Sequence, residues 1–249
     1  MAISLNSVIH YTDTLDNLKA ILTEGFHVKY CLENVTGQSV AFPMVSFCDI
    51  PLSEVLPHTK HYGEFAIGLT KSWAKTNNLN PVLYISEDSF LDRKFKDQID
   101  RLNQDVPKGN EKDWFWLKQI IAVMSYVKNV HGQITKNGNT FNVNHYNERE
   151  WRYVPTEDQL KLSGIQTFPI NFQIYGPTYV HNKAKINSYL KPLKLKFQAK
   201  DVTHLIVRDI DQAKLIIPFL RNQFSSIPGD DIDLLITKVI TIQQITEDF

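Results

Sequence analysis

The chain has 249 residues, 43% hydrophobic and 22% charged, so it can bury a substantial core as one large domain or two small ones. Its 27 lysines and arginines balance 27 aspartates and glutamates, which leaves a nucleic-acid partner unsupported, although a local basic patch is compatible with this balance. No stretch approaches the roughly 20 apolar residues of a membrane-spanning helix, and the N-terminus lacks secretory features, so we expect a cytoplasmic protein without membrane contact.

The N-terminal half predicts an alternation of short strands and short helices. An apolar stretch over residues 5–11 indicates a strand, and a capping cluster then precedes a helix that stops at Gly25. Pro51 suits the first turn of a short helix, which Asp49 is expected to cap, and Thr70 caps another. Further strands are expected over residues 42–48, 65–69 and 81–85.

Residues 114–127 form the longest helical candidate, which we interpret as a core helix. Its ring cluster Trp114, Phe115 and Trp116 lacks interleaved arginines, so it indicates core packing with one exposed ring and not a base-stacking platform. Residues 129–144 predict a loop or hairpin that turns at Asn137-Gly138 and is a candidate lid.

The last third predicts a helix over 183–193, a strand over 204–207, a helix over 210–224 and a final strand that begins with residues 233–236. No internal repeat or linker marks a domain boundary. We therefore expect one α+β domain over residues 1–249, with mixed or antiparallel sheets flanked by helices.

Metal and redox chemistry find little support in the sequence. The two cysteines, Cys31 and Cys48, lack zinc-site spacing and are expected to be reduced packing residues. His58 and His61 lie three residues apart, but no third ligand accompanies them, which favours a solvated helix face and no metal. No phosphate-binding glycine loop is present, which disfavours a kinase or a dehydrogenase.

The segment 147–155 holds the densest group of charged residues in an expected strand. Alternation along that strand separates charge from bulk, with Glu148, Glu150 and Arg152 on one face and Arg149, Trp151 and Tyr153 on the other. Because an inward charge is costly unless it is paired or used, Glu150 is the first candidate for chemistry. Three alternatives stay open: a solvated face with weak ion pairs, Glu148 as the acting carboxylate, and Arg152 as a mere neutraliser.

Partners for Glu150 are expected at the ends of the early strands. His10 ends the first strand and is placed to hold a hydroxyl or carbonyl of a ligand, while the rings of Tyr11 and Tyr62 can sandwich a planar base. Ser46 lies in the next apolar strand. We expect His10 and Glu150 to converge on one cleft.

These residues together resemble a known family. The motifs that carry the resemblance are Ile9-His10-Tyr11-Thr12, Gly25-Phe26, Tyr30-Cys31-Leu32-Glu33, Tyr62-Gly63, and the segments 18–22, 43–52, 67–69, 80–84 and 148–153. In number and order they are similar to the AbiGi family of abortive phage-resistance proteins, most clearly over residues 9–155. The resemblance implies bacterial defence against phage, and members are also described as the antitoxin-like half of a two-gene pair.

A more distant resemblance concerns chemistry. An early strand histidine, a helix ending in Gly-Phe and a late strand glutamate are similar to the histidine-tyrosine-glutamate arrangement of ADP-ribosyltransferase folds, which use NAD. That likeness implies His10 as the contact to the nicotinamide ribose, Tyr62 as the stacking ring and Glu150 as the acid that stabilises an oxocarbenium-like transition state. The remaining expected NAD contacts are Tyr11, Thr12, Ser46 and Arg152.

Two functions from different classes follow from the sequence. One is an effector enzyme that modifies a macromolecule or depletes NAD, with Glu150 and His10 as catalytic residues. The other is a non-catalytic antitoxin or infection sensor that works with a protein partner, either a toxin or a phage trigger.

Overall fold

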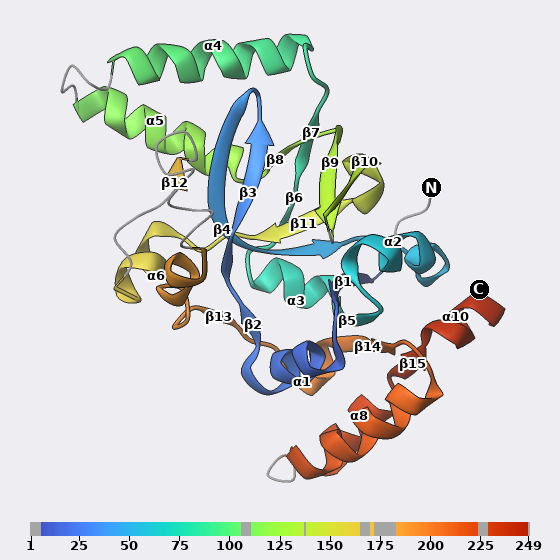
Figure 1. Cartoon of the computed structure of the whole chain (residues 1–249). Helices are drawn as coiled ribbons and strands as arrows, with labels where there is room; N and C mark the ends of the chain where they lie inside the picture. The colour runs from blue at the N-terminus through green and yellow to red at the C-terminus, as the bar shows by residue number, and fades with distance from the viewer. Residues whose placement is uncertain are drawn as a thin grey trace.

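The computed structural model describes residues 6–105, 111–136, 138–164, 170–171, 183–223 and 229–248 (Figure 1). Its strands are β1 (Ser7–Thr12), β2 (Phe26–His27), β3 (Lys29–Val35), β4 (Gln38–Cys48), β5 (Phe65–Thr70), β6 (Asn80–Pro81), β7 (Leu83–Ile85), β8 (Val127–Asn129), β9 (His131–Lys136), β10 (Asn139–Asn144), β11 (Glu150–Tyr153), β12 (Ile170–Asn171), β13 (Lys194–Leu195), β14 (Val202–Val207) and β15 (Val239–Thr241). The α-helices are α1 (Leu15–Glu24), α2 (Val55–Tyr62), α3 (Lys71–Thr76), α4 (Phe90–Asp105), α5 (Glu111–Met124), α6 (Glu157–Leu162), α8 (Ile210–Gln223), α9 (Gly229–Ile236) and α10 (Ile242–Asp248). Short 3-10 turns are η1 (Leu52–Glu54), η3 (His145–Glu148) and η4 (Ala199–Asp201).

One mixed sheet organises the described residues. Its strands follow the order β15-β14-β5-β1-β4-β11-β6, and β3 and β12 also pair with β4. Neighbouring strands are antiparallel except β14 and β15, which are parallel. The long strand β4 is the hub, because its first part pairs with β3 and its last part with both β1 and β11. The predicted mixed α+β architecture is thus confirmed.

Side chains on the two faces of the sheet build separate cores. One face carries Val8 and Phe47 and packs under α1, α3 and α8 in the largest cluster of buried apolar residues. The other face carries Ile9 and packs against η1, α2 and α10 in a smaller cluster. On this second face, along the hairpin of β3 and β4, a third apolar cluster joins the sheet to α4 and α5.

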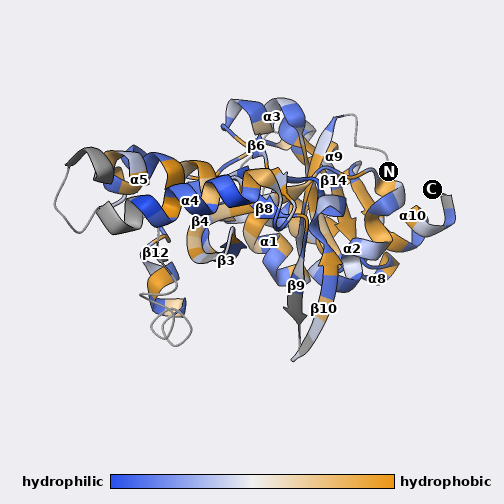
Figure 2. Ribbon diagram, turned by 90° about the horizontal axis from the view of Figure 1, so that it is seen from above, coloured by the Kyte–Doolittle hydropathy of each residue, from blue (hydrophilic) through white to orange (hydrophobic). Residues whose placement is uncertain are grey.

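The helices α4 and α5 form an arm at one end of the molecule. Figures 1 and 2 show them side by side, at the end opposite the chain termini. The arm leaves the sheet through β7 and returns through β8, and these two strands pair in parallel with Leu83 opposite Val127. Everything between β6 and β11 is therefore an insertion at one edge of the sheet.

Local sequence explains several element boundaries. Thr14 accepts a hydrogen bond from the backbone N–H of Asn17 and starts α1, and Gly25 ends it at a φ of +85° that favours glycine. The hairpin expected over residues 129–144 is confirmed as β9 and β10, with Gly138 at a φ of +79° in the turn. The helix expected at the start of 183–193 is also present, over residues 183–188.

One expected element of the fold is wrong. Residues 233–236 lie in helix α9 and not in a strand, because a short apolar run fits a buried helix as well as a strand. The strand at that end is β15, which pairs with β14. Asp49, which the sequence predicted as the cap of the helix at Pro51, pairs its carboxylate with Lys71 at 2.8 Å. No helix in the described ranges is both long and apolar enough to cross a membrane.

Candidate functional site

The register of the central strands decides which predicted site residues share a face. Ile9 of β1 and Glu150 of β11 both lie opposite Cys48 of β4. Because side chains alternate along a strand, Glu150 shares its face with Ile9, whereas His10 points to the other face. The predicted convergence of His10 and Glu150 on one cleft is therefore wrong.

His10 lies in the larger apolar core. Its ring packs against those of Phe26 and Phe47, with centroid separations of 5.1 and 5.5 Å. Its Nδ1–H donates to the backbone carbonyl of Ser46 at 2.8 Å. Burial is the main reason that the pKa of His10 is lowered, so the ring is neutral at pH 7. Its contacts are those of a structural histidine that joins β1 to β4.

Arg152 is the centre of the polar cluster on the opposite face. Its side chain is fully buried, and its Nε donates to Glu150 Oε1 at 2.7 Å. One terminal nitrogen donates to the carbonyl of Ser125 at 2.8 Å, and the other lies 2.9 Å from Glu33 Oε1. Burial opposes the charge of Arg152, but the two carboxylates outweigh burial and raise the pKa of its guanidinium.

Glu150 has both carboxylate oxygens engaged. Ser46 Oγ–H donates to Oε1 at 2.6 Å, and Lys128 Nζ donates to Oε2 at 2.8 Å. Burial favours the neutral acid, but Arg152 and Lys128 outweigh it and hold the pKa of Glu150 well below its usual range. At 3% exposure, the carboxylate is enclosed within the protein.

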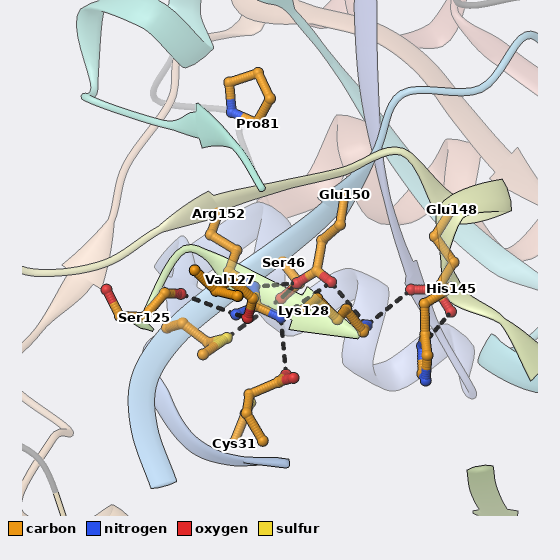
Figure 3. A network of polar contacts seen from close by, with 12 residues as sticks. Cys31, Ser46, Pro81, Ser125, Val127, Lys128, His145, Glu148, Glu150 and Arg152 are labelled. Carbon is orange, nitrogen blue, oxygen red and sulfur yellow. Dashed lines mark hydrogen bonds and ion pairs between the residues drawn. The ribbon is translucent and has the colours of Figure 1, made fainter. Parts of the chain in front are cut away.

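Lys128 of β8 bridges two acids. Its Nζ lies 2.9 Å from Glu148 Oε2 as well as 2.8 Å from Glu150 Oε2, and Figure 3 shows it between the two side chains. Burial disfavours its charge, yet the surrounding carboxylates raise the pKa of Lys128 well above its usual value. Beyond it, Glu148 also accepts a hydrogen bond from Tyr62 Oη, and His145 Nδ1 lies 3.5 Å away.

Glu148 reaches this cluster from a turn and not from a strand. It is the last residue of η3, and Arg149 follows with a φ of +46° before β11 begins at Glu150. The predicted strand alternation therefore holds for Glu150 and Arg152 but not for Glu148. The alternative of a solvated strand face is wrong, since all three side chains are buried.

A stack of rings borders the cluster on the side of α2. The rings of Tyr11, His58 and Tyr62 follow one another with centroid separations of 6.1 and 6.3 Å. His58 is only 8% exposed and contacts the carbonyl of Glu54 through Nδ1, so the expected solvated helix face is wrong for this residue. Among the described residues, no group of three or more acids, histidines or cysteines could hold a metal ion.

The structure thus brings together some of the predicted site residues and separates others. Ser46, Tyr62, Glu148, Glu150 and Arg152 form one connected network. Tyr11 borders that network on the same face. Thr12 lies with His10 on the opposite face, because it stands two residues further along β1.

Sequence reasoning missed two members of the network, Lys128 and Glu33. Lys128 lies between the helix expected over residues 114–127 and the loop or hairpin expected over 129–144, and β8 was not expected there. Glu33 points toward Arg152 from β3, and burial raises the pKa of its carboxyl despite the guanidinium. The sequence did carry a signal for Lys128. Two inward carboxylates, Glu148 and Glu150, face the single cation Arg152, and a buried carboxylate without a partner is costly, so a second cation was required.

The charged groups of the network are paired with one another. Two cations face three carboxylates, and the contacts run through the strands β3, β4, β8 and β11 together with η3 and α2. The surface hollow at the β9–β10 hairpin is lined by other residues, among them His131, Gln133 and Asn144. This geometry suits an internal scaffold that holds the arm to the sheet.

Comparison with known proteins assigns the chain to a family. A family model described as "abortive phage resistance protein AbiGi, antitoxin" matches residues 18–208. The chain belongs to the AbiGi family. A curated relative, "Abortive phage resistance protein AbiGi" of Lactococcus lactis subsp. cremoris, is 25% identical over 244 residues, which cover 90% of this chain and 95% of the relative. No solved structure matches.

The AbiGi match confirms the family that the sequence motifs suggested. It also places most of the main sheet inside the matched region, since β3, β4, β5, β11 and β14 all lie within residues 18–208. The polar network lies wholly inside that region too. The likeness to ADP-ribosyltransferase folds, by contrast, finds no support among solved structures.

Proposed function

We propose that this AbiGi-family protein is the antitoxin of a two-gene abortive-infection pair and acts by binding the toxin. The observation that carries the proposal is the placement of His10 and Glu150 on opposite faces of the sheet, with Glu150 enclosed in an ion-paired network. Groups so placed stabilise a fold and do not reach a substrate. The description of the matching family as an antitoxin supports the same function.

The alternative is an ADP-ribosyltransferase-like effector that uses NAD. It requires an early histidine and a late glutamate at one open site, within reach of the same ribose. Here Glu150 Oε1 and Oε2 are both taken by Ser46, Lys128 and Arg152. The effector therefore has less support than the antitoxin, and it is the contrary outcome of the test.

Expression in a bacterial host separates the two functions. The chain is produced alone, and then together with the product of the second gene of its pair, while growth and cellular NAD are followed. An antitoxin leaves growth and NAD unchanged when produced alone, and it restores growth when the second product is toxic. Growth arrest or a fall in NAD caused by the chain alone would refute the proposal.

The variant Glu150→Gln provides a second measurement that separates the antitoxin from the effector. Glu150→Gln keeps the size of the side chain but removes its charge, so we expect the folded protein to be less stable. An antitoxin variant should then neutralise the toxin in proportion to the amount of folded protein that remains. An effector would instead lose its toxicity completely while its folded amount stays the same. The folded amount is measured by soluble yield and circular dichroism.

A further inference from the structure

Helix α5 presents an apolar face to solvent. Phe115 and Trp116 are 55% and 56% exposed, and Val123 is 52% exposed. The two rings contact each other edge to face with a centroid separation of 5.4 Å. Sequence analysis expected a single exposed ring in this cluster, so the exposure of two large rings is a finding of the structure.

The exposed and buried residues of α5 divide the helix cleanly. At about 100° per residue, Leu117, Ile120, Ile121 and Met124 fall on one side, where they are buried or half-buried in the apolar clusters of the arm. The opposite side carries Phe115, Trp116, Lys118, Gln119, Ala122 and Val123, all of which are exposed. Large apolar side chains thus occupy both sides, which is typical of a helix that is covered on both sides.

The neighbouring helix α4 shows what a solvated face on this arm looks like. Phe90 and Leu91 at its start are 70% and 42% exposed, but from Arg93 to Arg101 its exposed side chains are charged or polar, namely Arg93, Lys94, Asp97, Gln98, Asp100 and Arg101. In α5, Lys118 is the single charged side chain from Phe115 to Met124. The two helices of one hairpin therefore differ, because exposed apolar side chains lie at the start of α4 but extend from Phe115 to Val123 along α5.

We propose that this face of α5, defined by Phe115, Trp116, Lys118 and Val123, is the surface on which the toxin docks. The inference rests on the proposed antitoxin function, which requires a protein partner. Exposed aromatic side chains beside a cation are typical of the residues that dominate protein interfaces. The fitting partner surface is an apolar hollow for the two rings, with a carboxylate at its rim to complement Lys118.

Charge favours a protein over a membrane surface at this face. A helix that binds anionic lipid carries several lysines or arginines on its polar side, whereas the two lysines in the sequence of α5, Lys112 and Lys118, are balanced by Glu111 and Asp113. The exposed charges of the adjoining α4 are mixed, with Arg93, Lys94 and Arg101 beside Asp97 and Asp100, so the arm lacks the one-signed basic face that binds anionic lipid. The arm is also well suited to reach a partner, because it projects from the end of the molecule away from both termini.

The test measures binding of the purified chain to the purified product of the second gene. Phe115→Ala combined with Trp116→Ala should weaken the Kd at least about 100-fold, as expected for a pair of central aromatic contacts. Lys118→Glu, which leaves the apolar packing intact, should weaken it in the same direction. The matched control is Leu215→Ala on α8, a similarly exposed position at 54%, which should leave the Kd unchanged.

The outcomes separate this inference from the proposed function. If the unaltered chain does not bind the second product, both proposals are refuted. If the aromatic double variant is folded by circular dichroism and still binds and neutralises like the unaltered chain, only the docking surface is refuted. Light scattering that shows a dimer lost in the double variant, or vesicle binding lost in it, would assign the face to a second copy or to lipid and would overturn the inference.

Discussion

The bridge made by Lys128 is the part of the network that one substitution can isolate. Lys128→Met keeps the length and the apolar stem of the side chain but removes the ammonium group. Two carboxylates, Glu148 and Glu150, then lose a contact of 2.9 and 2.8 Å respectively. Their side chains are 9% and 4% exposed, so water replaces the lost contact poorly.

The expected loss of unfolding free energy in Lys128→Met follows from the burial of the ion pairs that Lys128 makes. Removing one partner of a buried ion pair costs about 3–5 kcal/mol, a large part of a typical unfolding free energy of about 5–15 kcal/mol. Lys161 provides the matched control, because it also faces two acids, Glu157 and Asp158, at 3.7 and 3.9 Å but is 68% exposed. Lys161→Met should cost no more than about 1 kcal/mol.

Urea unfolding at pH 8 and pH 5, followed by circular dichroism, measures both variants. Without Lys128, the repulsion between the two carboxylates raises one carboxyl pKa, so the loss of stability should shrink as the pH falls toward 5. A Lys128→Met variant as stable as Lys161→Met at pH 8 would show that the network is hydrated and that the scaffold role is wrong.

Three further outcomes test the structure. Gly63→Ala should destabilise the fold by more than about 2 kcal/mol, since a Cβ there would lie 2.3 Å from Thr12 O, whereas Gly164→Ala meets no atom within 4 Å and carries only the strain of a positive φ; thermal unfolding compares the two. The folded pKa of His10 is lowered, so its contribution to stability is complete above about pH 6.5 and is lost as the pH falls below that value, by at most about 1.4 kcal/mol per pH unit; a His10→Gln variant should show a shallower loss in pH-dependent urea titrations. Loss of hydration raises the pKa of the half-buried Cys48 thiol, so iodoacetamide at pH 8 should modify Cys48 much more slowly in the folded protein than in urea, as mass spectrometry can follow, and equal rates would contradict the raised pKa.

Patterns of burial were predictable from the sequence wherever the period of the pattern was clear. The cap at Thr14 and the glycine stop at Gly25 define α1, and period-two alternation correctly separates Glu150 and Arg152 from Trp151. Both signals are local, so they survive without knowledge of the tertiary structure.

Relations between strands were not predictable in the same way. Whether His10 and Glu150 share a face depends on the registers of β1 and β11 against β4, and a shift of one residue in either register would reverse the answer. The same limit hid Lys128, which meets Glu150 across two strands that lie more than twenty residues apart in the sequence. The strand predicted from residues 233–236 is wrong for a different reason. A run of four residues is too short to show whether its hydrophobic period is that of a strand or of a helix.

The position of β4 at the hub of the sheet has a consequence for synthesis on the ribosome. Its last residues pair on one side with β1, which is made before it, and on the other side with β11, which is made about a hundred residues later. During that interval the nascent chain carries an unpaired strand edge, a template on which extended segments of other chains can add and aggregate. The burden on chaperones should therefore be greatest for fragments that end before Glu150.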